Sequence, residues 1–357
     1  MTDREDLIVD FLREAGFGDA VRTRLPGDAS TRRYERLTKA DGSTLMLMDQ
    51  PPTGAVPCPP DADEATREAL GYFASVRLSA GRLEAYEGAA RYLKGRGFSA
   101  PDIYAADLEN GLILHEDFGD ALFARLIEAG ENETPLYLAA VSVLAKLHED
   151  APPPTMGSWP LLTYDALALK TGADLFLDWL PQYDPSLSFS DAARKDWDAV
   201  WRPLREEAQA SASVFVHRDY HAENLIWLKG REGVARVGLI DFQDCLKGHA
   251  SWDLHSLLQD ARRDVSPEVE ALCLDHYFNL RPDEDRAAFM RLYTALAALN
   301  QARILGIFAR LVTRDKKPRY EAFMPRMWRH LGRNLSAPGL EDVKAWFVAN
   351  GLEGRIG

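Results

Sequence analysis

The sequence lacks the two glycine-rich signatures that most often mark a phosphate site. It contains neither Gly-x-Gly-x-x-Gly nor a Walker-type Gly-Lys-Ser/Thr, so no motif indicates a dinucleotide fold or a P-loop. Cysteine is also scarce, and the three residues Cys58, Cys245 and Cys273 form no Cys-x-x-Cys pair. An odd and sparse set of this kind indicates reduced thiols in a cytoplasmic protein.

Excess positive charge and long apolar runs are lacking as well. The 357 residues carry a net charge of −13, which argues against nucleic acid as the main partner because phosphate backbones require a basic face. The acidic N-terminus has no apolar signal core, and no run looks long and apolar enough to span a bilayer. We therefore expect a cytoplasmic protein that binds a small molecule, without nucleic acid or membrane.

What the sequence does contain is the composition of a folded protein, with 46% hydrophobic and 27% charged residues. Residues 1–115 show mostly antiparallel strand patterns plus one helix. From residue 116 onward helical patterns dominate, and the longest, at about 284–312, has an apolar stripe that we interpret as core. This shift predicts an α+β fold with an N-terminal lobe at 1–115 and a C-terminal lobe at 116–357.

The most informative stretch is residues 214–227, Val-Phe-Val-His-Arg-Asp-Tyr-His-Ala-Glu-Asn-Leu-Ile-Trp. An apolar run leads into a polar turn with Asp219 and Asn224, and a further apolar strand downstream delivers Asp241. This order suits metal-assisted phosphoryl transfer: one acid accepts or orients the attacking hydroxyl, and the other oxygens bind Mg²⁺ at the phosphates of ATP. The plainer interpretation is ordinary turn residues with a His217 that pins a loop. The order and the strand context favour catalysis.

With these residues in view, the chain resembles the aminoglycoside phosphotransferase and choline kinase superfamily, which shares the protein-kinase-like fold. The most specific parts are 217–224 and 240–244, Ile-Asp-Phe-Gln-Asp. Within that superfamily, 27–34, 47–52 and 305–311 are similar to the cell-wall amino-sugar kinases, which phosphorylate the anomeric hydroxyl of N-acetylmuramate and N-acetylglucosamine in peptidoglycan recycling. The resemblance implies a two-lobed kinase that uses ATP and Mg²⁺.

The resemblance also implies roles for individual residues. Asp219 would be the catalytic acid that receives the sugar hydroxyl, assisted by Asn224. Asn224 and Asp241 would be the Mg²⁺ ligands, and Asp253 would be a buried acid that braces the catalytic loop. The inter-lobe hinge against which adenine lies would be formed by Glu116, Asp117 and Phe118.

The sequence departs from the family at the residue that supplies positive charge to the phosphates of ATP. Kinases of this fold usually carry a Lys on the third strand, but residues 44–49 read Thr-Leu-Met-Leu-Met-Asp. The turn at 27–32 has small residues whose backbone N–H groups and hydroxyls could cup phosphates, although a plain hairpin loop is its simpler reading. We expect Arg32 or Arg33 to supply the missing charge. The residues predicted to contact ATP are Ser30, Thr31, Arg32, Arg33, Met48, Glu116 and Phe118.

The acceptor site is the least determined part. Gln243 and Asp244 closely follow Asp241, the expected Mg²⁺ ligand. We expect them to face the acceptor, with a loop-stabilising role as the alternative. Asp174 and Trp179 are candidates for hydroxyl contacts and sugar stacking, against the plainer reading of a helix with one buried Trp. The basic stretch at 314–319 could meet the lactyl carboxylate of N-acetylmuramate or be a solvated loop.

Three functions follow from these patterns. The first is an amino-sugar kinase, and the second is a kinase of another alcohol, such as an aminoglycoside, choline or homoserine, which the acidic balance would suit. The third is a catalytically silent pseudokinase, which the missing strand Lys supports and the joint retention of Asp219, Asn224 and Asp241 opposes. We expect a monomer that binds its sugar substrate and ATP.

Overall fold

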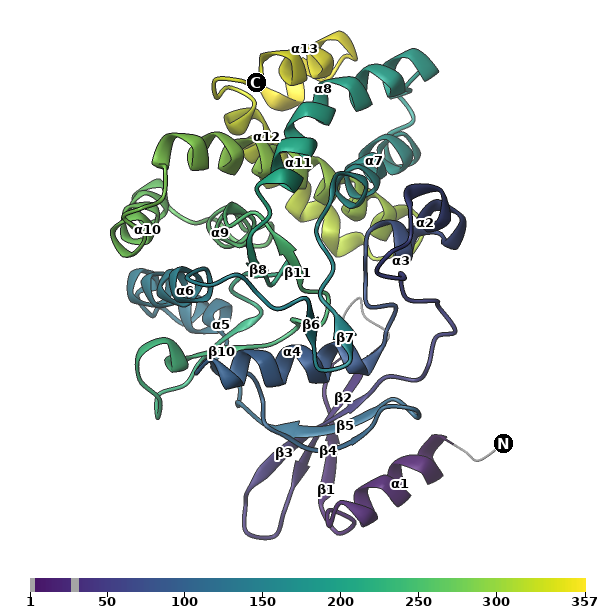
Figure 1. Ribbon diagram of the computed structural model, residues 1–357, viewed down its shortest axis with the longest axis vertical. Coiled ribbons are helices and arrows are strands. Elements are labelled where there is room, and N and C mark those ends of the chain that lie inside the picture. The colour runs from purple at the N-terminus through teal and green to yellow at the C-terminus, as the bar shows by residue number, and fades with distance from the viewer. Residues whose placement is uncertain (1–3, 27–31) are drawn as a thin grey trace.

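The computed structural model describes residues 4–26 and 32–357. Its N-terminal part is a five-stranded antiparallel sheet in the order β1-β2-β3-β5-β4, shown at the bottom of Figure 1. The predicted combination of a small antiparallel sheet with a mostly helical remainder is confirmed. The strands are β1 (Val21–Arg24), β2 (Arg33–Thr38), β3 (Thr44–Asp49), β4 (Ile103–Asp107) and β5 (Leu112–Glu116).

The two faces of this sheet are covered by different helices because side chains alternate along each strand. Leu47 of β3 packs in a small cluster with Phe11 of α1 (Arg4–Glu14) on one face. Met48, the next residue of β3, belongs to the main core together with Tyr86 of α4 (Leu83–Gly95). Helix α4 therefore lies between the sheet and the helical body, and α1 lies on the outer side (Figure 1).

The helical body begins after β5. Its helices are α5 (Phe123–Glu128), α6 (Glu133–Leu147), α7 (Ala166–Tyr183), α8 (Asp191–Ala210), α9 (Ser251–Leu258), α10 (Pro267–Leu280), α11 (Arg286–Thr313), α12 (Met324–Asn334), α13 (Glu341–Ala349) and α14 (Glu353–Ile356). Short 3₁₀ segments lie at Gly233–Arg236 and Pro318–Phe323. Short antiparallel pairs within this body are β6 (Thr155–Met156) with β7 (Trp159–Pro160), β8 (Val214–Val216) with β11 (Leu246–Gly248), and β9 (Leu225–Trp227) with β10 (Val237–Leu239).

Two short helices from the N-terminal half also lie with the helical body. Helices α2 (Glu64–Leu70) and α3 (Tyr72–Ser75) sit beside α7 in Figure 1. Arg67 of α2 joins them to the N-cap of α7, because its guanidinium donates to both oxygens of Asp165 at 2.5 and 3.0 Å. The predicted lobe boundary at residue 115 therefore divides the chain in sequence but not fully in space. Helices α2 and α3 precede it in sequence, yet they pack against the helical body.

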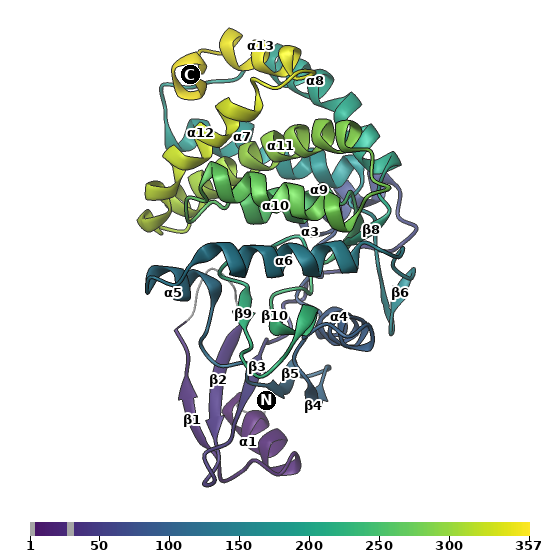
Figure 2. The same cartoon turned by 90° about the vertical axis from the view of Figure 1, so that its left-hand side faces the viewer.

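Helix α11 forms the centre of the body, between α7, α9 and α12 (Figure 2). At 28 residues it is long and apolar enough to cross a membrane by length and composition, which corrects the expectation that the chain has no such run. Within the fold, however, 72% of its most apolar window is buried. This burial is typical of a core helix, and α11 is the only such candidate among the residues that the structure describes.

Candidate active site

A cavity of about 760 Å³ lies between the sheet and the helical body. Strands β2 and β3 contribute one wall, and the loops after β8 and β10 together with α11 contribute another. Because such a concave space with convergent polar groups is the usual form of a small-molecule site, it is the candidate active site. The sequence-predicted residues that line it are Arg32, Glu116, Phe118, Asp219, Asn224 and Asp241.

Two short strand pairs place the polar loops at this cavity. Strand β8 pairs with β11 and β9 pairs with β10, so the loop that carries Asp219 and Asn224 is anchored at both ends. Asp241 follows β10, and the backbone N–H of Ile240 donates to the carbonyl of Asn224 at 3.2 Å. These backbone bonds bring the loop and the end of β10 to one edge, where the sequence order predicted them to meet.

The loop is braced from below by α9. Fully buried Asp253 accepts the backbone N–H of His217 at 2.6 Å and that of Arg218 at 2.9 Å. Burial raises the pKa of Asp253 to about 7, although the two donors favour its charged form. Trp252 adds a bond from its indole N–H to the carbonyl of Arg218 at 3.1 Å. The bracing role implied for Asp253 is therefore confirmed.

Backbone strain is stored on both sides of this brace. Arg218 has φ 81° and Asp241 has φ 64°, in the left-handed region that residues other than glycine seldom adopt. His217 pins the two segments together, since its Nε2 lies 3.0 Å from the carbonyl oxygen of Ile240. His217 therefore has the loop-pinning role that was its plainer interpretation, and this role is compatible with catalysis by the neighbouring residues. Positive φ values such as those of Arg218 and Asp241 are common at functional sites.

The amide of Asn224 is oriented by its own loop. Its Nδ2 donates to the carbonyl of Asp219 at 2.9 Å and lies 3.3 Å from Nε2 of His221. These bonds use the nitrogen and not the amide oxygen, which is the atom that a hard cation requires. Asn224 is thereby positioned to offer an oxygen toward the same space as Asp241.

Arg32 currently supplies the positive charge beside Asp241. Its Nη2 lies 2.7 Å from Oδ1 of Asp241, and its Nη1 donates to Oε1 of Gln243 at 2.8 Å. Desolvation alone would raise the pKa of Asp241, but Arg32, Gln243 and His217 lower it. A carboxylate that is held ionised by a cation, next to an amide oxygen, is a donor set that suits Mg²⁺.

A complete cage for a metal is not present among the described residues. No group of three or more His, Cys, Asp or Glu side chains there is arranged to hold an ion. Mg²⁺ characteristically uses one or two protein oxygens and completes its shell with water and nucleotide phosphates. Asn224 and Asp241 meet that requirement, and Asp219 lines the same cavity.

Only some of the remaining residues predicted to contact ATP line the cavity. Glu116 and Phe118 line the cavity, and Arg231 pairs with the Glu116 carboxylate while its guanidinium lies 5.1 Å from the Phe118 ring centroid. Ser30 and Thr31 lie outside the described residues. Arg33 is exposed and does not line the cavity, whereas Arg32 does.

Met48 is also away from the cavity. It is fully buried in the main core, and Met46, two residues earlier on the same face of β3, lines the cavity instead. Helix α4 presents Tyr86, which stacks on Phe242 with ring centroids 4.9 Å apart. Strand β3 therefore carries methionines on this face, next to Tyr86 of α4, and none of its residues is a Lys that could pair with a Glu of α4.

The four predicted acceptor residues lie outside the cavity lining. Gln243 is buried and bonded to Arg32 and Asp241. Asp244 accepts the backbone N–H of Ser79 at 2.7 Å. Both contacts hold the loop after Asp241, which corresponds to the loop-stabilising alternative.

Asp174 and Trp179 are occupied elsewhere on α7. Asp174 accepts from Lys170 and from the indole N–H of Trp197 at 3.1 Å. Trp179 carries the guanidinium of Arg314 5.6 Å from its ring centroid. The sequence placed both residues on a helix but could not tell which face of that helix meets the cavity, and the structure turns them away from it.

Helix α11 supplies the residues that the sequence missed. Asn300, Arg303, Ile304, Ile307 and Phe308 line the cavity, although the stripe had been interpreted as core alone. The helix is fixed by close packing on α7, because a Cβ on Gly306 would lie 2.3 Å from the carbonyl carbon of Leu175. The available signal was the polar interruption by Asn300 and Arg303 within an otherwise apolar stripe.

Cys245 lies near the site but does not line the cavity. It is buried, and burial together with nearby Asp244 raises the pKa of its thiol well above the usual range. The other two cysteines are likewise free and buried. These surroundings are those of a small packed core residue.

Comparisons with known proteins agree with the geometry. The sequence model of the phosphotransferase enzyme family matches residues 21–293. The chain is 54% identical to the N-acetylmuramate/N-acetylglucosamine kinase of Caulobacter vibrioides, over 97% of this chain and 96% of that protein. It is 30% identical to the N-acetylmuramate/N-acetylglucosamine kinase of Pseudomonas aeruginosa, over 88% and 85% of the two chains.

A solved structure with the same fold is a choline/ethanolamine kinase family protein from Mesorhizobium loti. The TM-score is 0.57 at 14% sequence identity, with 96% of this chain and 98% of that chain covered. At that identity the likeness concerns the fold alone. It confirms the kinase-like architecture, in which a small sheet and a helical body enclose the cavity.

Proposed function

The chain belongs to the phosphotransferase enzyme family, and we propose that it transfers the γ-phosphoryl group of ATP to the anomeric hydroxyl of N-acetylmuramate and N-acetylglucosamine. The observation that carries this proposal is the convergence of Asp219, Asn224 and Asp241 on one cavity in a chain whose 54% identical relative is named for both sugars. We place the enzyme in the cytoplasm, as a monomer, in peptidoglycan recycling.

Asp219 acts as the catalytic acid–base residue in this proposal. Its carboxylate accepts the proton of the sugar hydroxyl as the hydroxyl oxygen attacks the γ-phosphorus. The brace from Asp253 to the backbone of His217 and Arg218 fixes the position of Asp219 next to the acceptor. Positioning of this kind is the main contribution that a protein makes to a loose phosphoryl transition state.

Asn224 and Asp241 would hold Mg²⁺, which their amide and carboxylate oxygens suit, and the ion would supply neutralisation of the phosphate charge of ATP. With Mg²⁺ bound at Asp241, Arg32 would be free to contact the phosphates, and it would supply the charge that a strand Lys provides in other kinases of this fold. Its present contact at 2.7 Å shows that its side chain reaches the metal acid.

The nucleotide base lies against the segment from Glu116 to Phe118. This segment follows β5 directly and lines the cavity on the side of the sheet. Met46 of β3 contributes an apolar surface from the same side. An apolar wall with nearby backbone donors and acceptors is the usual environment of a bound purine.

The decisive experiment is a kinase panel with ATP and Mg²⁺ against N-acetylmuramate, N-acetylglucosamine, glucose, kanamycin and choline. We expect turnover with the two N-acetylated sugars, and ³¹P NMR should show the product phosphate attached at the anomeric carbon. Exclusive turnover of kanamycin or choline would instead assign the chain to another alcohol. Absence of both turnover and ATP-dependent thermal stabilisation would identify a pseudokinase.

A further inference from the structure

The acceptor side of the cavity holds two guanidinium groups that lack a neutralising carboxylate. Arg218 and Arg303 both line the cavity, as Asp219 does. Across residues 4–26 and 32–357, neither of them has a carboxylate oxygen within the 4.0 Å of an ion pair. Three other arginines of the lining are paired: Arg32 with Asp241, Arg36 with Asp117 and Asp120, and Arg262 with Glu223. The remaining one, Arg125 of α5, has no ion pair in the described part of the chain either, but it is exposed to solvent.

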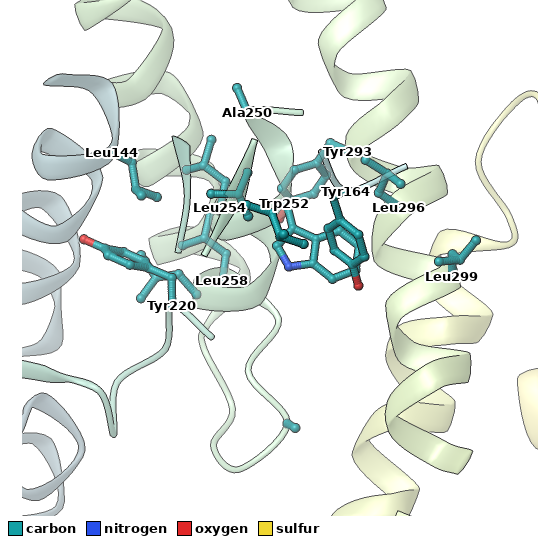
Figure 3. Close-up of a cluster of buried hydrophobic side chains, with 14 of the residues drawn as sticks. Leu144, Tyr164, Tyr220, Ala250, Trp252, Leu254, Leu258, Tyr293, Leu296 and Leu299 are labelled. Atoms are coloured by element: carbon teal, nitrogen blue, oxygen red, sulfur yellow. The ribbon is translucent and has the colours of Figure 1, made fainter. Parts of the chain in front are cut away.

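Arg218 is buried with part of its hydrogen-bonding capacity unused. Its residue is 3% exposed, and its Nε and Nη1 have no hydrogen-bond partner in the described part of the chain. The guanidinium lies 5.0 Å from the ring centroid of Tyr164, which packs edge-on against Trp252 at 4.5 Å (Figure 3). A buried donor without an acceptor is costly, and such groups persist where a ligand completes them.

Arg303 approaches the same space from α11. Its side chain crosses α7 at Gly172, where a Cβ would lie only 3.1 Å from the Arg303 Cδ. Its Nη1 donates to Oδ1 of Asn300 at 3.0 Å. Asp219 and Asp244 lie close enough to act on it electrostatically without pairing with it. The glycine on α7 thus leaves room for the Arg303 side chain, which lines the same cavity as Asp219.

The position of this pair favours an anion on the acceptor over the phosphates of ATP. The proposed phosphate position is already faced by Arg32 directly before β2, by Asn224 directly before β9 and by Asp241 after β10. Arg303 instead belongs to α11, whose Asn300 and Ile304 line the cavity on the helical side. Guanidinium groups match the planar fork of a carboxylate, and two of them suit one carboxylate well.

We infer that Arg218 and Arg303 form an anion subsite that binds the carboxylate of N-acetylmuramate and determines its use relative to N-acetylglucosamine. This inference rests on the proposed function, and it goes beyond that function by naming the residues that distinguish an acidic from a neutral sugar. The basic stretch at 314–319 is thereby assigned no part in the distinction.

The first test changes the substrate and leaves the protein intact. Wild-type enzyme is assayed with N-acetylmuramate and with its carboxamide, in which the carboxylate is replaced by a neutral group of similar size. We expect kcat/KM to be about 10- to 100-fold lower for the carboxamide, the range for a hydrogen bond between charged groups. Equal kcat/KM values for the two compounds would overturn the inference.

The second test combines that substrate change with Arg303→Met and Arg218→Met. If the subsite is correct, each variant loses at least tenfold more kcat/KM with N-acetylmuramate than with N-acetylglucosamine, and Arg303→Met no longer separates the acid from its carboxamide. Arg303→Lys, which keeps the charge but not the fork, should recover part of the loss. Equal losses on both sugars, or a loss expressed as a higher KM for ATP, would contradict the inference.

A matched control lies on the same helix. Arg286 is exposed at the N-terminal end of α11 and pairs with Asp275, so Arg286→Met should leave both sugars unaffected. Melting curves of all variants establish that they are folded. The inference and the proposed function fail separately: a wild-type enzyme that phosphorylates neither sugar removes the function, whereas turnover of both sugars with no effect of Arg303→Met removes only the subsite.

Discussion

The two walls of the cavity handle positive charge in opposite ways. On the side of the sheet, Arg32 and Arg36 of the β2 segment are each held by carboxylates. On the helical side, Arg218 and Arg303 have no such partner among the described residues. Under the proposed function, the arginines of the first wall would have to exchange partners to bind a ligand, whereas those of the second could pair with a ligand directly.

This difference separates two kinds of recognition. Arg32 lies 2.7 Å from a carboxylate oxygen of Asp241, so under the proposed function a cation bound there would compete with Arg32 for that oxygen. An acidic acceptor that reaches Arg218 and Arg303 meets no competing carboxylate in the described part of the chain. On the sheet side, the affinity for metal and nucleotide would therefore depend on Arg32 giving up Asp241. On the helical side, the affinity for an acidic sugar would depend only on its pairing with the two arginines.

The largest expected effect comes from the residue that lies between the two walls. Asp219→Asn removes the proton acceptor and leaves the shape of the loop, so we expect kcat to fall by about 10²–10⁴-fold. Thermal denaturation should show a folded protein, because the brace from Asp253 reaches the backbone of the preceding two residues and not the Asp219 side chain. A variant with near-normal kcat would remove Asp219 from the mechanism.

The next effect tests the wall formed by the sheet. Arg32→Met removes the guanidinium that reaches Asp241, and we expect KM for ATP to rise by about 10-fold or more, the cost of a lost charged hydrogen bond. Arg33→Met is the matched control, because Arg33 is exposed and outside the cavity lining. Steady-state kinetics at saturating sugar measure both variants.

The outcome would decide between the two arginines that the sequence left open. An unchanged KM for ATP in Arg32→Met would show that Arg32 does not supply the positive charge that the missing Lys provides in other kinases of this fold. A larger effect of Arg33→Met than of Arg32→Met would assign the role to the exposed residue. The proposed exchange of Arg32 between Asp241 and the phosphates is supported only if KM for ATP rises clearly in Arg32→Met and not in Arg33→Met.

A smaller effect is expected when the helical wall is displaced. A Cβ at Gly306 would lie 2.3 to 2.5 Å from backbone atoms of Leu175 and Phe176, so Gly306→Ala forces α11 away from α7. We expect a loss of about 1–3 kcal/mol in the free energy of unfolding, as for other overpacked interfaces. In the same variant, KM should rise for the sugars more than for ATP, because α11 contributes to the helical wall.

Gly95→Ala provides the comparison for that experiment. Gly95 is also helical, but an added Cβ there meets no atom within 4 Å, so its substitution should be neutral or slightly stabilising. Urea denaturation measures the free energies of unfolding of both variants. Equal stabilities would mean that the close approach of α7 and α11 relaxes without cost.

The sequence was most informative where chemistry is local. Asp219, Asn224 and Asp241 sit in short loops between apolar strands, and their order along the chain already predicts that they meet. The brace by Asp253 followed from resemblance and not from any spacing. Residues on one contiguous segment are predictable because the chain itself holds them together.

The acceptor wall could not be predicted because it depends on which face of a helix meets the cavity. Asp174 and Trp179 lie on α7, one helix away from the wall that α11 forms. In β3 the error was smaller, since Met46 and Met48 share a face and only the packing of α4 decides which of them is covered. These choices are made by tertiary contacts that no local pattern encodes.

The smallest expected effect concerns the basic stretch at 314–319, which lies outside the cavity lining. Lys316 is exposed, and its ammonium group donates to the carbonyl of Thr313 at 2.7 Å, so it is engaged with its own loop. Exposed charges contribute little to binding because water and salt screen them. We expect Lys316→Met to change kcat/KM by less than about twofold with either sugar, in line with the low value of surface ion pairs. If Lys316→Met instead lowered kcat/KM for N-acetylmuramate alone, the carboxylate would be recognised by the basic stretch at 314–319, and the contrast between the paired and unpaired arginines of the cavity would not explain the choice of sugar.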